Sequence, residues 1–237
     1  MKRLLSLLTA VLFVTALPLA AFAKEVTFTA RDPFGRDVAK FETSAPLETI
    51  IGTTNVISGE VRVNLEDITN SRATFEVDVA SFNSGNQKRD QDMREKFLHT
   101  DRYPKARLTL IKILSSSNGR RLIDGEPIEI KAEGILSLHG VERPVVADLT
   151  VTYLKESEAT RSRLPGDLLR VSGTLPLKLS DFNIERPQLL ILRLSDDVKV
   201  SVDLIASTKR PGKALNPCAV ANPCAPVNPC SANQGKW

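Results

Sequence analysis

Residues 73–113 read ATFEVDVASFNSGNQKRDQDMREKFLHTDRYPKARLTLIKI, and the fold can be worked out from this stretch. In its opening segment Phe75 and Val77 lie on an apolar face, and Glu76 and Asp78 lie on a polar one. An alternation with a period of two residues predicts a β-strand that is buried on one side. The stretch therefore begins with a half-buried strand.

A polar break, NSGN, separates that strand from a short charged helix. Met93 and Phe97 are four residues apart, so they share one narrow apolar edge of the helix. The helix must end before Pro104, because the residue that precedes a proline is pushed into an extended conformation. Residues 107–114 can then leave as a second strand. A helix inserted between two long antiparallel strands predicts a lid or plug.

Three segments of the chain occur in the order that one known family shows. They are SFNSGNQKRDQDMREKFLHTDRYPKARLTL at 81–110, LSLHGV at 136–141 followed by RPV at 143–145, and LSDFNI at 179–184. Together they resemble the YceI-like family over roughly residues 26–206. The resemblance implies a lipocalin-like antiparallel barrel that encloses a long apolar ligand of the isoprenoid type.

The chain departs from the family pattern at two places in the helix. Asp92 and Met93 stand where the family commonly has a His-Leu pair, and Phe97 and Leu98 stand where a Phe-Phe pair is frequent. A ligand contact made by that family histidine is therefore not carried over to this chain.

The rest of the chain reads as strands separated by turn signals such as Asn118-Gly119 and Asp124-Gly125. Many evenly spaced strands and a single short helix predict an all-β fold, either an antiparallel barrel or a sandwich. With the resemblance, the expectation is a lipocalin-like barrel with one short helix inserted between strands. The expected strands span residues 25–30, 38–44, 56–65, 72–80, 107–114, 127–138, 145–154, 168–179 and 198–206.

A closed barrel of about eight strands can be filled by side chains or can hold one small ligand. The inward candidates are mostly mid-sized aliphatic residues, and their composition leaves both outcomes open. The resemblance favours a cavity. The candidate ligand-binding residues are Phe75, Val77, Arg89, Asp90, Met93, Phe97, Leu98, Leu136, Leu149 and Val171.

The two charged candidates have two interpretations. Arg89 and Asp90 could hydrogen-bond the polar head of a quinone or isoprenoid at the barrel mouth, or they could cap the helix and tie it to a strand. Of the two histidines, His99 is expected as a cation at the helix C-terminus, and His139 is expected to serve a tight turn. No HExxH, CxxC or phosphate-loop motif is present. We therefore expect no catalytic residues, no metal site and no cofactor, although a bound isoprenoid lipid or quinone is compatible with the sequence.

Residues 1–23 have the charged start, apolar run and Ala-Phe-Ala end of a secretory signal peptide, so the mature chain is expected to begin at Lys24. The apolar run from 4 to 17 is shorter than the roughly 20 residues that a membrane-spanning helix needs. Without this segment the chain keeps all 28 acidic residues and loses only Lys2 and Arg3 of its 32 basic ones, which leaves a net charge of +2. That balance gives no reason to expect nucleic acid as a partner.

Residues 210–237 differ in kind from the barrel domain expected at 24–209. Asn-Pro-Cys recurs there and places Cys218, Cys224 and Cys230 six residues apart. A short repeat without a hydrophobic period predicts a disordered or polyproline-like tail outside the barrel. An odd number of cysteines in an oxidising compartment leaves a thiol that can pair with another molecule. The three cysteines are also weak candidates for a soft metal, and incidental thiols are the third reading.

The sequence thus predicts a secreted or periplasmic protein that holds or carries a long apolar isoprenoid-type lipid or quinone without chemical turnover. A hydrolase or isomerase that uses Asp90 or His99 at the barrel mouth is one alternative. An envelope stress or adhesion module that acts through its thiol tail is another. The identity of the lipid and the oligomeric state do not follow from the residues.

Overall fold

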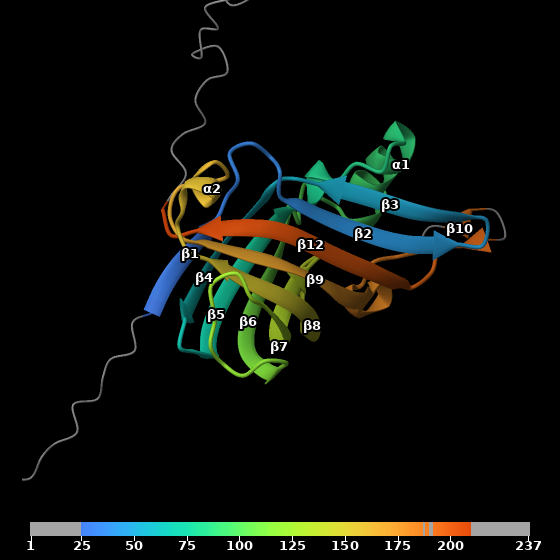
Figure 1. The fold of residues 1–237 in the computed structure, drawn as a ribbon. Coiled ribbons are helices and arrows are strands. Elements are labelled where there is room, and N and C mark those ends of the chain that lie inside the picture. The colour runs from blue at the N-terminus through green and yellow to red at the C-terminus, as the bar shows by residue number, and fades with distance from the viewer. Residues whose placement is uncertain (1–24, 187, 190–191, 210–237) are drawn as a thin grey trace, which may run out of the picture.

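The computed structural model describes residues 25–186, 188–189 and 192–209 as one antiparallel barrel (Figure 1). Eight strands follow one another around the barrel in the order β1-β4-β5-β6-β7-β8-β9-β12, and β12 pairs back to β1. They are β1 (Glu25–Ala30), β4 (Ile57–Asn64), β5 (Asp67–Asp78), β6 (Lys105–Ser116), β7 (Pro127–Leu138), β8 (Val141–Leu154), β9 (Leu168–Lys178) and β12 (Asp197–Ser207). The predicted all-β barrel is confirmed.

A hairpin of β2 (Val38–Ala45) and β3 (Glu48–Thr54) extends one wall of the barrel (Figure 1). The first part of β12 pairs with β2, whereas only Ala206 and Ser207 at its end pair with β1. An isolated bridge from Thr53 to Asn83 joins β3 to the segment that follows β5. The hairpin therefore completes the wall where β1 does not reach.

The list of expected strands was wrong to omit β3. Its sequence, ETIIGTT, places Ile50 next to Ile51, so polar and apolar residues do not alternate. In the structure Ile50 is buried and Ile51 is exposed on the opposite face. A short hairpin of β10 (Gln188–Leu189) and β11 (Leu192–Arg193) was also not predicted.

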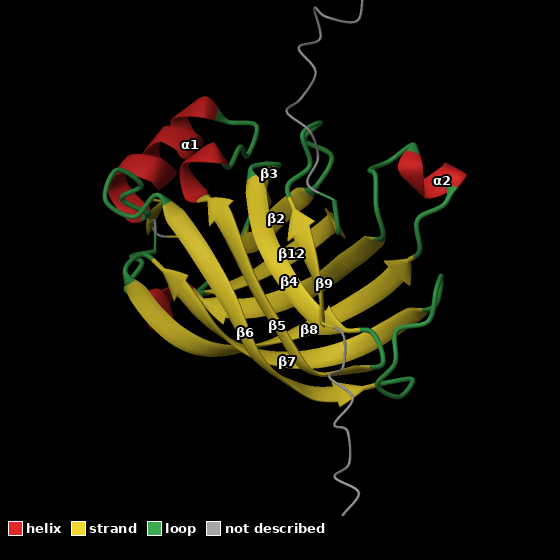
Figure 2. Cartoon of the chain, turned by 90° about the vertical axis from the view of Figure 1, so that its left-hand side faces the viewer, coloured by secondary structure: helices red, strands yellow, loops and turns green. Residues whose placement is uncertain are grey.

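The expected helix is present between β5 and β6, and it changes type along its length. It follows the turn η1 (Val79–Ser81), begins as α1 (Gln87–Asp92) and continues as one π-helical turn, η2 (Met93–Phe97). Asn86 caps its start, since its side-chain oxygen accepts a hydrogen bond from the Arg89 N–H at 3.1 Å. The single-turn elements α2 (Glu158–Arg161) and η3 (Leu179–Phe182) lie elsewhere in the chain. Figure 2 shows α1 at the ends of β5 and β6, over one opening of the barrel.

At the other end of the barrel the core contains some of the most completely buried side chains of the described residues. Phe28 and Leu168 are at most 1% exposed there, and Tyr153 meets Phe28 edge to face with ring centroids 6.3 Å apart. Interiors packed in this way resist changes of volume.

A buried carboxylate holds the β1–β2 connection against the barrel. Asp37 is 2% exposed and accepts a hydrogen bond from the Ile205 N–H in β12 at 3.1 Å. Arg163 Nη2 lies 3.5 Å from the same Asp37 oxygen. Burial raises the pKa of Asp37, and the bond from Ile205 acts in the opposite direction.

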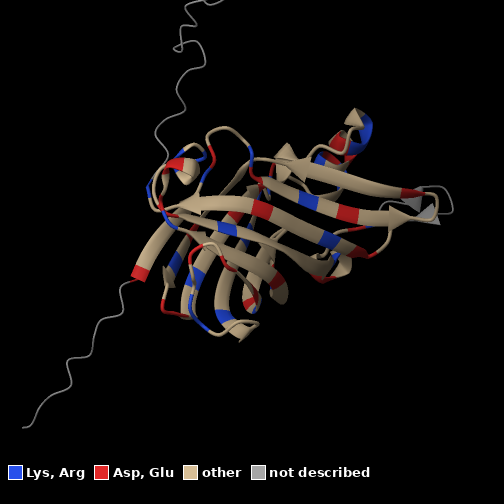
Figure 3. Ribbon diagram, viewed as in Figure 1, with Lys and Arg blue, Asp and Glu red and all other residues tan. Residues whose placement is uncertain are grey.

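Basic and acidic residues are interspersed along the strands of the barrel in Figure 3. Many form cross-strand pairs, such as Arg170 with Asp203 at 2.7 Å. Exposed pairs of this kind contribute little stability. They keep the outer face polar while the alternate residues point inward.

Candidate functional site

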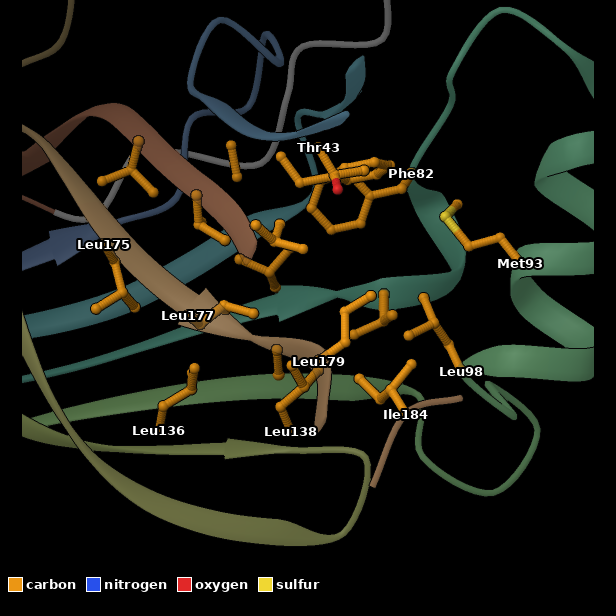
Figure 4. Close-up of a pocket in the computed structure, with 18 of the residues that line it drawn as sticks. Thr43, Phe82, Met93, Leu98, Leu136, Leu138, Leu175, Leu177, Leu179 and Ile184 are labelled. Carbon is orange, nitrogen blue, oxygen red and sulfur yellow. The ribbon is translucent and has the colours of Figure 1, made fainter. Parts of the chain in front are cut away.

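The half of the barrel next to α1 contains a cavity of about 660 Å³. Figure 4 shows Leu136 and Leu138 of β7 and Leu175 and Leu177 of β9 pointing into it. Each pair is two residues apart, so the alternation of the strands places one side chain after another on the cavity wall. The family resemblance favoured a cavity over a filled interior, and this half of the barrel does contain one.

The helix between β5 and β6 roofs this cavity. Met93, Phe97 and Leu98 line it from above, and Figure 4 shows Met93 and Leu98 approaching from the helix. The π-helical turn brings Met93 and Leu98 onto the same side, because the Leu98 N–H donates to the Met93 carbonyl at 2.9 Å. The expected lid is therefore in place.

Two aromatic rings stand beside the roof. Phe82 follows η1 and packs edge to face against Phe41 of β2, with ring centroids 5.2 Å apart. Both rings line the cavity. Phe41 has room because Gly52 lies beside it in β3, where an added Cβ would come within 2.2 Å of the ring.

Charged residues line the cavity only at its mouth, and most of them are paired. Asp92 receives hydrogen bonds or ion contacts from Lys88 at 2.8 Å and Lys96 at 2.9 Å. The hydrogen bond from Lys88 is the largest cause of the lowered pKa of Asp92, followed by that from Lys96. Arg89 pairs with Glu48 of β3 at 3.2 Å. The mouth is thus polar and close to neutral, whereas the depth of the cavity is apolar.

Arg89 and Asp90 tie the helix to its surroundings. Arg89 donates from Nε to the Ser84 hydroxyl at 2.8 Å and from Nη2 to the Ser84 carbonyl at 3.0 Å, and it also lines the cavity mouth. Asp90 is 5% exposed and accepts a hydrogen bond from the Ser84 N–H at 3.0 Å. The Asp90 side chain does not line the cavity.

The two histidines form a pair outside the cavity. His99 Nδ1 lies 2.9 Å from His139 Nε2, and His139 Nδ1 lies 3.0 Å from the Phe182 carbonyl oxygen. Since a carbonyl only accepts, His139 Nδ1 donates to it, and a neutral His139 therefore accepts from His99. Neither ring lines the cavity, so this pair joins the end of the helix to the β7–β8 turn.

The structure gathers the candidate residues into one place, with Asp90 as the exception. Phe75, Val77, Arg89, Met93, Phe97, Leu98, Leu136, Leu149 and Val171 all line the cavity. Sequence reasoning missed wall residues from β2, β3 and the loop after η3, among them Phe41, Ile50 and Ile184. The alternation at Val198 and Val200 in β12 was visible, and these residues also line the cavity. No comparable signal marked β3.

Some expectations fall on residues that the structure does not describe. The segment 1–23 and the cysteines Cys218, Cys224 and Cys230 lie outside the described residues. Within the described part, no group of three His, Cys, Asp or Glu side chains is placed to hold a metal ion. None of the helices in that part is long and apolar enough to cross a membrane.

Comparison with known sequences and structures agrees with this architecture. Residues 23–206 match the family model described as YceI-like domain. The curated relatives include UPF0312 proteins of Vibrio parahaemolyticus and Vibrio campbellii, each 26% identical over 136 residues, which is 57% of this chain and 65% of the relative. The aligned part thus spans slightly less than two thirds of these relatives.

Similar solved structures share the barrel. BcnA of Burkholderia cenocepacia is 19% identical with a TM-score of 0.54, and 73% of this chain covers 97% of it. A polyisoprenoid binding domain from Saccharophagus degradans, implicated in plant cell wall breakdown, is 20% identical with a TM-score of 0.56, and 78% of this chain covers 99% of it. At these identities the similarity shows a common fold.

Proposed function

Since this chain belongs to the YceI-like family, we propose that it binds and carries a long apolar isoprenoid-type lipid or quinone inside its barrel. The observation that carries the proposal is the 660 Å³ cavity with an apolar depth and a polar mouth. Its volume lies in the range of about 300–1,000 Å³ that small-molecule sites occupy. The solved polyisoprenoid binding domain with the same fold supports this ligand class.

The lining favours a ligand with a hydrocarbon tail and a single polar end. Burial of apolar surface contributes about 25 cal/mol per Å², and the depth of the cavity offers aliphatic side chains such as Leu136, Leu175 and Val200. An unpaired polar group placed there would lose its hydrogen bonds to water. The tail therefore enters first, and the polar head stays at the mouth near Arg89 and Lys88.

We propose binding without chemical turnover. The groups named for a hydrolase or isomerase, Asp90 and His99, are hydrogen-bonded to Ser84 and His139 and do not line the cavity. A general acid or base must lie within hydrogen-bond reach of the reacting atoms. Neither group faces the space in which the tail or the head of the ligand would lie.

We also propose that the protein acts after export, in the periplasm or outside the cell, because residues 1–23 have the pattern of a signal peptide. Exported protein should then begin at Lys24. Its intact mass checks this, and an exported chain that still contains residues 1–23 would contradict it.

The binding proposal is tested by extraction and reloading. The purified protein is extracted with organic solvent, and mass spectrometry identifies what is released. The delipidated protein is then titrated with geranylgeraniol and with a short-chain ubiquinone, and titration calorimetry reports binding. We expect a prenyl lipid in the extract and saturable binding of at least one of the two probes. If the extract contains no apolar lipid and neither probe binds, the proposed function is wrong.

A further inference from the structure

The cavity ends at a layer of side chains, and a second, smaller cavity lies behind it. The small cavity has a volume of about 50 Å³ and is lined from β4 to β9. Four residues border both cavities: Phe75, Leu110, Leu149 and Val171. They come from β5, β6, β8 and β9, so they form a layer across the barrel.

Glycines in the neighbouring strands set the position of three of these side chains. Phe75 pairs with Gly59, Leu110 with Gly134 and Leu149 with Gly173. An added Cβ would lie 2.4 Å from the Phe75 ring at Gly59, 3.2 Å from Leu110 at Gly134 and 2.6 Å from Leu149 at Gly173. Each glycine leaves the space into which its partner leans.

These glycines stand at inward positions of their strands. Gly59 lies between the buried residues Ile57 and Val61, two residues from each. Because side chains alternate along a strand, a larger residue at position 59 would also project into the barrel. At this level of the barrel, each of these cross-strand pairs therefore contributes only one side chain to the interior, because its other member is a glycine.

We propose that Phe75, Leu110, Leu149 and Val171 form a floor that fixes how long a lipid tail the barrel accepts. This inference rests on the proposed function and names the chain-length selectivity of the same site. A tail enters from the mouth under α1 and extends until its end meets the floor. Additional isoprene units then remain in water at the mouth and add no affinity.

Buried side chains behind the floor limit how far it can yield to a ligand tail. Behind it, Ile68, Leu122 and Leu169 are at most 5% exposed and line the small cavity. The cavity between them and the floor is only about 50 Å³, so the floor side chains have little room to move aside. In front of the floor the half-exposed residues of the mouth and the helix roof can adapt to the tail.

The test measures binding of prenyl alcohols of increasing length, from farnesol through geranylgeraniol to longer homologues, to the delipidated protein. For the wild type, affinity should rise with tail length and then reach a plateau. Phe75→Ala and Leu110→Ala open the floor into the small cavity, so the plateau should move to a longer alcohol. In these two variants, the first alcohol beyond the wild-type plateau should bind at least about tenfold more tightly than the next shorter one, which corresponds to about 1.4 kcal/mol.

Leu177→Ala is the matched control for Leu110→Ala. Leu177 lines only the large cavity, further towards the mouth, and the same atoms are removed from a half-buried leucine. This variant should weaken binding of all the alcohols by a similar factor and leave the plateau at the wild-type length. A melting curve of each delipidated variant shows whether it is folded. If Phe75→Ala does not fold, Leu110→Ala is used for the test.

The outcomes separate the floor from the proposed function. The floor hypothesis is wrong if the wild type shows a plateau and both floor variants leave it at the same tail length. It is also wrong if Leu177→Ala moves the plateau as far as the floor variants do. In either case the proposal of lipid binding still holds. If the wild type binds no prenyl alcohol at any length, the proposed function fails for this ligand class, and the floor fails with it.

Discussion

The Nδ1 atom of His99 lies 2.9 Å from the Nε2 atom of His139, and the two imidazole rings stack with their centroids 5.2 Å apart. Both residues have a left-handed backbone, with φ of 45° and 53°. This contact joins the end of the helical roof to the β7–β8 turn. It fastens the end of the roof to that turn at a specific point.

Replacing His139 should loosen the roof without unfolding the barrel. His139→Ala removes the acceptor for His99 and the donor to the Phe182 carbonyl, each bond contributing about 0.5–1.5 kcal/mol. We expect faster amide hydrogen exchange in residues 93–103 and unchanged exchange in β7 and β8. Faster exchange throughout the barrel would show instead that the pair supports the whole fold.

The hydrogen bonds of Arg89 predict that lysine cannot replace it. Its guanidinium reaches the Ser84 hydroxyl, the Ser84 carbonyl and Glu48 at once, and a single ammonium group cannot copy this geometry. Arg89→Lys should lower the free energy of unfolding by about 1.5–3 kcal/mol, the amount associated with hydrogen bonds to charged groups.

The control for Arg89 is its neighbour Lys88, whose side chain is 70% exposed and pairs with Asp92. Lys88→Ala should change stability by about 0.5 kcal/mol or less, as for other surface positions. Both variants are measured by urea unfolding. If both substitutions lower the free energy of unfolding equally, Arg89 does not hold the helix in place as proposed.

Phe97 and Phe182 should respond differently to truncation. Phe97 lines the cavity and is half-buried, so Phe97→Ala should lower lipid affinity about tenfold, or about 1.4 kcal/mol, and change the melting of delipidated protein little. Phe182 is 1% exposed and does not line the cavity. Phe182→Ala should therefore cost about 3–5 kcal/mol of stability. If Phe97→Ala melts as low as Phe182→Ala and neither protein loses affinity, Phe97 belongs to the core.

The buried carboxyl of Asp37 predicts a specific pH dependence of stability. Burial raises its pKa in the folded state above the ordinary value of 3.8. The folded state then binds more protons than the unfolded state between these two pKa values, so the free energy of unfolding falls as pH rises through that window.

Asp37→Asn should remove this fall, because the amide keeps an oxygen to accept the Ile205 N–H and has no proton to lose. The measurement is urea unfolding of both proteins at a series of pH values from about 3.8 upward. The difference between variant and wild type should grow in favour of the variant with pH. Parallel pH profiles would contradict the assignment.

The sequence by itself determined the elements whose signals are local. The alternation around Phe75 and Val77 marked β5, and Pro104 marked the end of the helical segment. Met93 and Phe97 marked the face of the roof that meets the cavity. Each of these signals depends on neighbours within a few residues, where backbone geometry alone decides which side chains share a face.

Only the tertiary structure decided how the barrel closes and what remains empty inside it. β12 pairs with both β2 and β1, and His99 meets His139; these contacts join residues that are far apart in the chain. The strand β3 and the hydrogen bond between Asp90 and Ser84 are not marked by any periodic pattern. The cavity depends on which cross-strand partner faces each inward glycine, as Phe75 faces Gly59. That register is set by hydrogen bonds between strands, so it appears only when the strands have paired.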